Sequence, residues 1–414
     1  MSDLRSLRLS FLALALLALP LSLRAQQQNT CLDCHGSADG NLKITSEQIA
    51  QDIHFQKGLT CASCHGGDPT SMEAMDPKKG FKGHISHNKV PELCASCHAN
   101  GSYMRGFNPS LRTDQLAQYK TSVHGKKLAA GDTHVAVCID CHGVHGIRPA
   151  SDTRSPVYPT NVAKTCSRCH ADREYMKAYD IKTDQFAGYS ASVHYDALAV
   201  RGDLSAPTCT TCHGNHGAAP PGVASVENVC STCHVLQAQL FDTSKHKTAF
   251  QAAGFPGCVT CHSNHRISKP SDTLLGTGPG AVCVNCHTQG DAGFALAASV
   301  HKELVSTQAA IARSDEILTR AERDGMEVSQ AQLELIDARD RLTKARVTQH
   351  SSQAAKIDED IKVARTVSDK TYEAGVQAMK ERNYRRLGLG ISLITIAAMV
   401  LGLRLFISDL ESKK

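Results

Sequence analysis

Every cysteine in this chain belongs to one five-residue pattern, Cys-x-x-Cys-His. The sequence has 414 residues and 18 cysteines, and nine copies of the pattern account for all of the cysteines. Two thiols at this spacing can form thioethers with the vinyl groups of haem, and the adjacent histidine can bind the iron from one side. The spacing therefore predicts nine covalently bound c-type haems. The eighteen cysteines are Cys31, Cys34, Cys61, Cys64, Cys94, Cys97, Cys138, Cys141, Cys166, Cys169, Cys209, Cys212, Cys230, Cys233, Cys258, Cys261, Cys283 and Cys286.

Two other uses of paired cysteines fit this pattern poorly. A disulfide framework gives no reason for a histidine after each second cysteine. A structural zinc site usually takes four ligands from two paired knuckles, which leaves the many additional histidines unexplained. We therefore favour haem attachment over both.

The 21 histidines fall into sets that match this chemistry. Nine are the proximal ligands predicted from the motifs, and nine more are predicted to fill the opposite faces of the irons. His134, His350 and one member of the His84/His87 pair are left without a predicted haem; we assign His87 and leave His84 as its alternative. The proximal set is His35, His65, His98, His142, His170, His213, His234, His262 and His287. The distal set is His54, His87, His124, His145, His194, His216, His246, His265 and His301.

An internal repeat explains most of the distal set. Residues 97–125 and 169–195 align through Cys-His, Tyr-Met and Ser-Val-His, and a shortened copy follows. The repeating module is Ser-x-His, then CxxCHxxH, then CxxCH, and it carries two haems. His142 and His145 are too close in sequence to hold opposite faces of one porphyrin, so we expect His145 to reach a neighbouring haem. Met104 and Met176 occupy matched positions and are alternative ligands, but packing is the favoured interpretation.

Both ends of the chain carry apolar segments. Arg5 and Arg8 precede the apolar run Phe11–Leu23, which is typical of a signal peptide ending near residue 25. Beyond His301, apolar residues recur every three or four positions, which predicts three long helices with breaks at Gly325 and Ser351-Ser352. The last of them continues into the 21 apolar residues 387–407, enough to cross a bilayer.

The sequence thus predicts a mainly α protein: a loop-rich multihaem domain with short helices, a bundle of long helices and one C-terminal transmembrane helix. The expected order is a signal peptide (1–25), a nine-haem cytochrome c domain (26–290), a coiled-coil-like region (291–386), a membrane span (387–407) and a cytoplasmic tail (408–414). Because haem attachment takes place outside the cytoplasm, we expect a single-pass inner-membrane protein whose haem domain faces the periplasm or the exterior.

The net charge argues against nucleic acid as a partner. The formal value is +5, and loss of Arg5, Arg8, Arg24 and Asp3 with the signal peptide leaves +3. Each ferric haem with two ionised propionates adds roughly −1, which brings the loaded protein to about −6. We expect redox partners instead, namely the quinol pool or a membrane complex on one side and a soluble or outer-surface acceptor on the other. The long helices could also support self-association.

The nine CxxCH motifs, the Ser-Val-His positions and the CHGxHGI segments make residues 31–301 resemble multihaem c-type cytochromes. The long helices after the last haem are similar in architecture to those of the multihaem nitrite reductase and hydroxylamine oxidoreductase group. Two features depart from related enzymes: no CxxCK motif is present, and the anchor is C-terminal, whereas the quinol dehydrogenases of nitrate and nitrite reduction carry it at the N-terminus.

Two functions follow from this resemblance. The favoured one is electron transfer through a series of low-spin haems, with no catalytic residues. The alternative is a quinol dehydrogenase, or a reductase of a small nitrogen or sulfur oxyanion, with one five-coordinate haem. The haem at Cys31 is the candidate for that open site, because no histidine of the repeat is clearly assigned to it.

The first prediction concerns stoichiometry. The purified protein should give about nine haems per chain in a pyridine haemochrome assay, because nine motifs are present. A haem content far below nine, measured against amino-acid analysis of the same sample, would contradict the haem interpretation.

Overall fold

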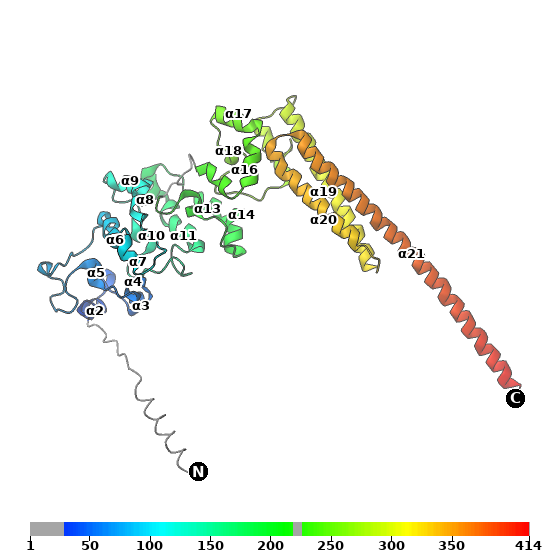
Figure 1. Ribbon diagram of the computed structural model, residues 1–414, viewed down its shortest axis with the longest axis horizontal. Coiled ribbons are helices and arrows are strands. Elements are labelled where there is room, and N and C mark those ends of the chain that lie inside the picture. The colour runs from blue at the N-terminus through cyan, green and yellow to red at the C-terminus, as the bar shows by residue number, and fades with distance from the viewer. Residues whose placement is uncertain (1–28, 218–225, 414) are drawn as a thin grey trace, which may run out of the picture. The chain divides into compact units, whose positions relative to one another are not determined.

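The computed structural model describes residues 29–217 and 226–413. The predicted signal peptide, residues 1–25, lies outside this range. The described residues form helices joined by loops and contain no strand (Figure 1). The predicted fold class is therefore confirmed: short helices in the cysteine-rich part are followed by three long helices, the last of which is apolar towards its end.

The CxxCH motifs form helical turns. In seven of the nine motifs the histidine is the last residue of an α-helix, as in α5 (Cys61–His65) and α10 (Cys138–His142). Residues three and four apart lie on one face of a helix. Both thiols and the imidazole of each such motif therefore face the same side, as attachment to one porphyrin requires.

The described chain divides into two compact units. The first unit ends at Cys166 and also takes in His216. Its helices are short because most of them end at a cysteine motif or a glycine, and two end at Asp52 and Ser122, which cap the helices that follow. They are α2 (Thr30–His35), α3 (Ser46–Gln51), α4 (Ile53–Gln56), α5, α6 (Val90–His98), α7 (Gly101–Arg105), α8 (Gln115–Thr121), α9 (Val123–Ala129), α10 and most of α11 (Pro159–His170), with 3₁₀ turns at Gly40–Leu42, Pro77–Lys79 and His87–Lys89.

The second unit contains the later cysteine motifs together with the long helices. Its cysteine-rich part again consists of short helices. These are α12 (Arg173–Met176), α13 (Gln185–Ser190), α14 (Val193–Tyr195), α15 (Cys209–His213), α16 (Val235–Asp242), α17 (Lys245–Ala253) and α18 (Gly257–His262), with a π-turn at Asp196–Val200 and 3₁₀ turns at Lys177–Tyr179, Val226–Thr232, Asp272–Leu274 and Cys283–Asn285.

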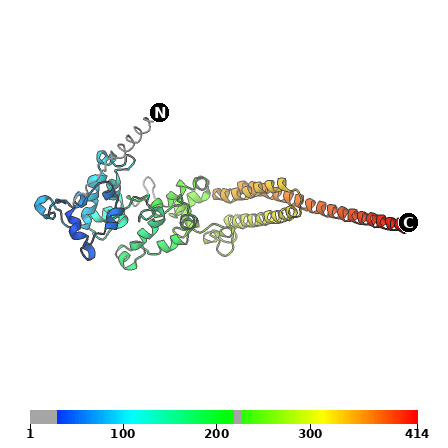
Figure 2. The ribbon, with the colours of Figure 1, turned by 90° about the horizontal axis from the view of Figure 1, so that it is seen from below.

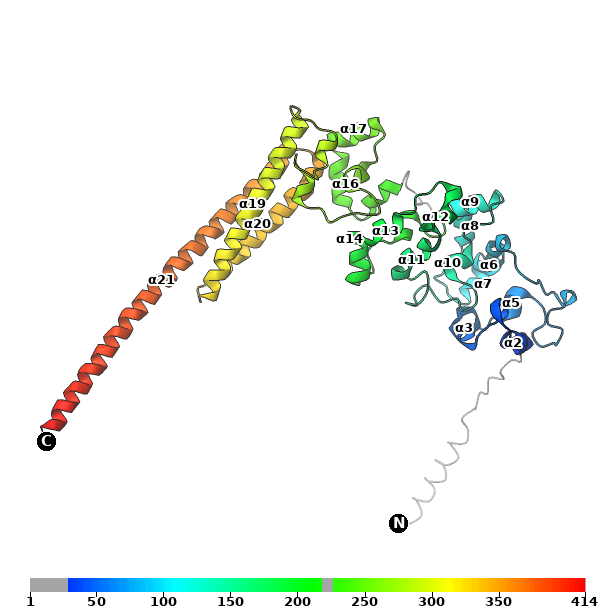
Figure 3. The same ribbon diagram turned by 180° about the vertical axis from the view of Figure 1, so that it is seen from behind.

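Three long helices complete the second unit. They are α19 (Ala292–Arg323), α20 (Ser329–Thr348) and α21 (Ala354–Ser412), and they pack side by side (Figures 1 and 3). The breaks fall where they were predicted: Gly325 and Ser352 both adopt a positive φ. Residues 349–351 form a 3₁₀ turn between α20 and α21.

The bundle has an apolar core. Leu318, Leu335 and Leu342 are at most 1% exposed, and most of the predicted apolar positions are buried with them. Ala374 is an exception: it is exposed, and its neighbour Gly375 faces the core instead, where an added Cβ would lie 2.6 Å from Ile317. The third helix can approach closely at this point because the residue has no side chain.

Helix α21 continues well beyond the bundle (Figure 2). By length and composition, it is the one described helix that is apolar enough to cross a membrane. Its apolar part is exposed throughout, from Leu387 to Ile407. Just before this part, Arg382 and Arg386 pair with Asp324, which caps the end of α19. The hairpin of α19 and α20 therefore ends against the start of the apolar segment.

The second prediction concerns the bundle. Leu335→Ala should lower the free energy of unfolding by about 2–5 kcal/mol, because a buried side chain is lost and a cavity remains. Thermal unfolding followed by far-ultraviolet circular dichroism measures the change.

Leu333→Ala is the matched control, because the side chain of Leu333 is 62% exposed on the same helix. Its effect should stay within about 0.5 kcal/mol. Equal losses in the two variants would show that the apolar face has been assigned wrongly.

Candidate functional site

The histidine rings are arranged as facing pairs. A metal–imidazole bond is about 2 Å long and the ring centre lies about 1 Å beyond the nitrogen, so two imidazoles on opposite faces of one iron have centres about 6 Å apart. Seven pairs in the described chain match this spacing, with centroids 6.0–6.3 Å apart. They are His54–His98, His65–His145, His142–His216, His194–His234, His213–His265, His246–His287 and His262–His350.

Each pair combines two kinds of histidine. One member always follows a CxxC sequence, and the other comes from elsewhere in the chain. No disulfide joins any of the 18 cysteines, all of which lie in the described chain, even where two are close together in space. The donor set therefore fits a covalently attached haem with two axial imidazoles.

In six of the seven pairs the second histidine arrives by one of two routes. In the first route a histidine near the start of a short helix faces the motif that ends its own module, as His194 faces His234 and His246 faces His287. In the second route the histidine of CxxCHxxH faces an earlier motif. His145, for example, lies against His65 and not against its neighbour His142. Successive modules within a unit are thus joined by facing pairs of histidines.

Burial favours the neutral form of many of the histidines. Removal from solvent lowers the pKa of ten histidines below the ordinary value. A neutral imidazole is the form that binds a metal. The ten are His98, His142, His145, His170, His194, His213, His216, His246, His262 and His265.

Helix caps place the first-route histidines. Ser192 and Ser244 cap α14 and α17, and the histidine of each Ser-x-His is the second residue of its helix. Asp52 plays the same part for His54 at the start of α4, where its side chain accepts from the His54 backbone N–H at 2.8 Å. Asp-x-His is therefore a variant of the Ser-x-His signal.

Asp52 also connects two iron sites. Its Oδ2 accepts hydrogen bonds from the backbone of Gly146 and Ile147, which directly follow His145. Burial alone would raise the pKa of the Asp52 carboxyl, but bonds from His54, Ile147 and Gly146 outweigh it and hold the pKa at about 2. One ionised carboxylate thus positions His54 and the loop that carries His145.

The backbone is strained at two of the second-route histidines. His145 and His265 adopt φ values of 47° and 44°, in the left-handed region that side chains disfavour. The same hydrogen bond closes both turns: the N–H of Ile53 donates to Ile147, and that of Val193 donates to Ile267. This turn carries the second histidine away from the CxxCH that precedes it.

Cysteine side chains of successive motifs meet in the first unit. The thiols of Cys31 and Cys61 share a hydrogen bond, as do those of Cys94 and Cys138. Cys64 and Cys97 are close enough to interact electrostatically. The first four motifs therefore lie next to one another in sequence order.

The second unit has the same order. His170 interacts with His213, and Cys212 interacts with Cys233. The thiols of Cys230 and Cys258 share a hydrogen bond, and Cys261 interacts with Cys283. Motifs five to nine therefore also follow one another in space.

Three predicted ligands need separate mention. The His87 Nε2 atom, which would have to face an iron, lies 2.9 Å from Oδ2 of Asp140. His301 is inside α19 rather than at a helix start, and no imidazole faces it in the described chain. His124 has the Ser-x-His cap of the other modules. The roles of all three remain predictions.

Sequence reasoning left out one residue that the structure brings into a pair. His350 lies in the turn between α20 and α21 and faces His262 at 6.0 Å. The sequence carries no clear signal for it: Thr348 lies two positions earlier, as Ser192 lies before His194, but the Thr348 side chain makes no capping hydrogen bond. His35 is the reverse case. The sequence predicts it as a ligand because it follows a CxxC sequence, but no imidazole in the described chain faces it.

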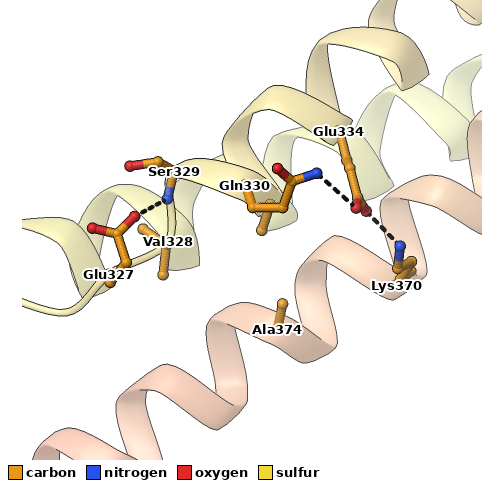
Figure 4. A pocket seen from close by; sticks show the side chains of 8 residues that line it. Glu327, Val328, Ser329, Gln330, Glu334, Lys370 and Ala374 are labelled. Atoms are coloured by element: carbon orange, nitrogen blue, oxygen red, sulfur yellow. Dashed lines mark hydrogen bonds and ion pairs between the residues drawn. The ribbon is translucent and has the colours of Figure 1, made fainter.

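The bundle also carries a shallow pocket that does not belong to these sites. It has a volume of about 240 Å³ and lies between α20 and α21 (Figure 4). Glu334 lies at its centre, with Gln330 and Lys370 as partners at 3.3 and 2.8 Å. Its lining contains neither cysteine nor histidine, so it offers no haem ligand.

Comparison with known proteins agrees with this chemistry. The family model for the doubled CXXCH motif matches residues 251–292. The chain is 25% identical over 173 residues to the cytochrome c-type protein NrfB of Haemophilus influenzae. The matched segment covers 36% of this chain and 66% of that protein. It is 23% identical over 208 residues to the C-type polyheme cytochrome OmcC of Geobacter sulfurreducens. This matched segment covers 44% of this chain and 25% of that protein.

The chain is a multihaem c-type cytochrome. Its CxxCH motifs bind haem c covalently. The matched segments span less than two thirds of the length of these two relatives. No solved structure matches the cytochrome.

The third prediction tests His350. In His350→Ala, the cytochrome should gain a high-spin ferric signal in electron paramagnetic resonance, because the iron held by His262 loses its second imidazole. The signal should correspond to one haem per chain.

His134→Ala is the control, because the His134 side chain is 80% exposed. It should leave the spectrum unchanged. The assignment would be wrong if the high-spin signal appeared in His301→Ala and not in His350→Ala.

Proposed function

We propose that this cytochrome carries electrons between a membrane donor and acceptors in the periplasm or outside the cell, through nine covalently bound haems. The donor would be the quinol pool or a membrane complex, and the acceptor a soluble or outer-surface redox protein. Bound haem supplies one-electron chemistry, and the protein sets its spacing, burial and axial ligation.

One observation carries this proposal: the facing imidazole pairs. Two histidines on opposite sides leave an iron with no position for a substrate. The histidines of seven motifs are seen facing such a partner in the described chain. This arrangement supports transfer of electrons without conversion of a bound molecule.

The order of the motifs supports transfer over a distance. Neighbouring motifs within each unit interact through their cysteines or histidines, so electrons could pass between sites in sequence order. Shared ligands hold neighbouring sites together and so keep each step short. We assign no catalytic side chain.

The apolar C-terminal segment supports a location at the inner membrane. Residues 387–407 would span the inner membrane once, with residues 408–414 in the cytoplasm. Haem attachment outside the cytoplasm would then place residues 26–386 on the periplasmic or exterior side. The bundle could also mediate self-association, because it carries exposed apolar side chains such as Leu333 and Ile336.

A second candidate function rests on His35. Its Nδ1 atom lies 2.9 Å from the carbonyl oxygen of Leu42, as in an oriented ligand, but no imidazole faces it. An open position there would suit a quinol dehydrogenase or a reductase of a small nitrogen or sulfur oxyanion.

Electron paramagnetic resonance of the oxidised full-length protein distinguishes the two functions. Electron transfer alone predicts low-spin signals that account for all the haem. The enzyme predicts a high-spin signal from one haem, and added cyanide should convert that signal to low spin. A high-spin signal that persists across several haems would contradict both.

The fourth prediction tests the anchor. A chain ending at Arg386 should keep its haem content and move from the membrane to the soluble fraction, because it lacks the apolar segment. Haem absorbance in the fractions after ultracentrifugation measures the change.

A chain ending at Ile407 is the control and should stay in the membrane, because it lacks the polar tail alone. Equal partition of the two chains would contradict a C-terminal anchor.

A further inference from the structure

We propose that Asp52 and Asp291 are positioning residues that lower the reduction potentials of two haems, those attached at Cys94 and Cys283. Each carboxylate accepts a hydrogen bond from the Nδ1–H of an axial histidine. The inference rests on the proposed haem ligation by His54 and His287, and it gives each compact unit one site of this kind.

At the ninth motif, the carboxylate follows its histidine by four residues. Oδ1 of Asp291 lies 3.1 Å from Nδ1 of His287. The same side chain caps α19, where it accepts hydrogen bonds from the backbone of Phe294 and Thr288. The N-terminus of a 32-residue helix favours a negative charge, so this carboxylate stays ionised.

At the third motif, the carboxylate precedes the distal ligand. Oδ1 of Asp52 lies 3.1 Å from Nδ1 of His54, whose ring faces His98. The Asp52 side chain is 5% exposed, so solvent screens its charge weakly. Its remaining partners are backbone N–H groups, and no lysine or arginine pairs with it in the described chain.

Other histidines have uncharged partners at Nδ1. His35, His65 and His350 lie against backbone carbonyl oxygens, at 2.9, 3.4 and 2.8 Å. His246 lies 2.9 Å from the hydroxyl of Ser352. These partners orient a ring without adding a full charge, so the two aspartates are a distinct class.

The charge acts on the iron through the ring. A carboxylate that accepts the Nδ1 proton makes the imidazole a stronger donor at its other nitrogen. Stronger donation favours Fe(III), which carries one more positive charge than Fe(II). Reduction adds one electron to the iron from an external one-electron donor, and the Nδ1–H stays on the ring. The potential of that site is therefore lower than with a neutral partner.

Spectroelectrochemical titration of the full-length holoprotein tests this proposal. Asp291→Asn and Asp52→Asn should each shift one of the nine one-electron reductions to a higher potential, and the double variant should shift two. Asparagine is itself a good helix cap, so α4 and α19 keep their starts. Asp291→Glu, which restores a carboxylate, should return the potential towards that of the unaltered protein if the longer side chain still reaches His287.

Asp242→Asn is the matched control. It removes one negative charge near Cys258, where Asp242 pairs with Lys247 and touches no axial imidazole. This variant should produce a smaller shift than the two others.

The outcomes separate this inference from the proposed function. Unchanged potentials in a protein that still holds nine low-spin haems would overturn the role of the aspartates and leave electron transfer intact. Equal shifts in Asp242→Asn and Asp291→Asn would show a general charge effect and also overturn it. Absence of haem would instead overturn the proposed function.

Discussion

An iron in a porphyrin plane has two faces, and this chain can fill only one of them locally. The CxxCH turn supplies the first imidazole within five residues, whereas the second must come from elsewhere. In the seven pairs seen here it comes from a short helix of the same module, from a neighbouring module or, for His262, from the turn before α21. The caps, the left-handed turns and the Asp52 bonds all serve this one requirement.

The sequence was most informative where the chemistry is local. The CxxCH turns, the three long helices and their breaks were predictable because each depends on residues a few positions apart. Geometry alone predicted that His145 belongs to another site, because His145 follows His142 too closely for the two rings to face each other. Its particular partner, His65, could not be named, because that pairing depends on how two modules pack.

The pattern of letters says less about where a second histidine lies. His301 matched Ser-Val-His by its letters, but the motif lies inside α19, where Ser299 caps no helix start. His350 had no matching letters, and Thr348, two positions earlier, makes no capping hydrogen bond, so the sequence pattern did not mark it. His87 was chosen over His84 only to complete the count of nine, and the position of Asp140 opposite its Nε2 could not be foreseen. These cases depend on how turns and helices pack, which a local pattern does not specify.

The second route of ligation has an evolutionary consequence. Within a unit, the first haem of a module takes its second histidine from the CxxCHxxH of the next, and His262 takes His350 from the helical bundle, where the array stops. If one whole module were removed or duplicated, each first haem would still have a second histidine. The module or helix that then follows it supplies an equivalent imidazole. The bundle then acts as the terminal cap of a repeat protein. Such a cytochrome could gain or lose haems in twos while its C-terminal helices stayed the same.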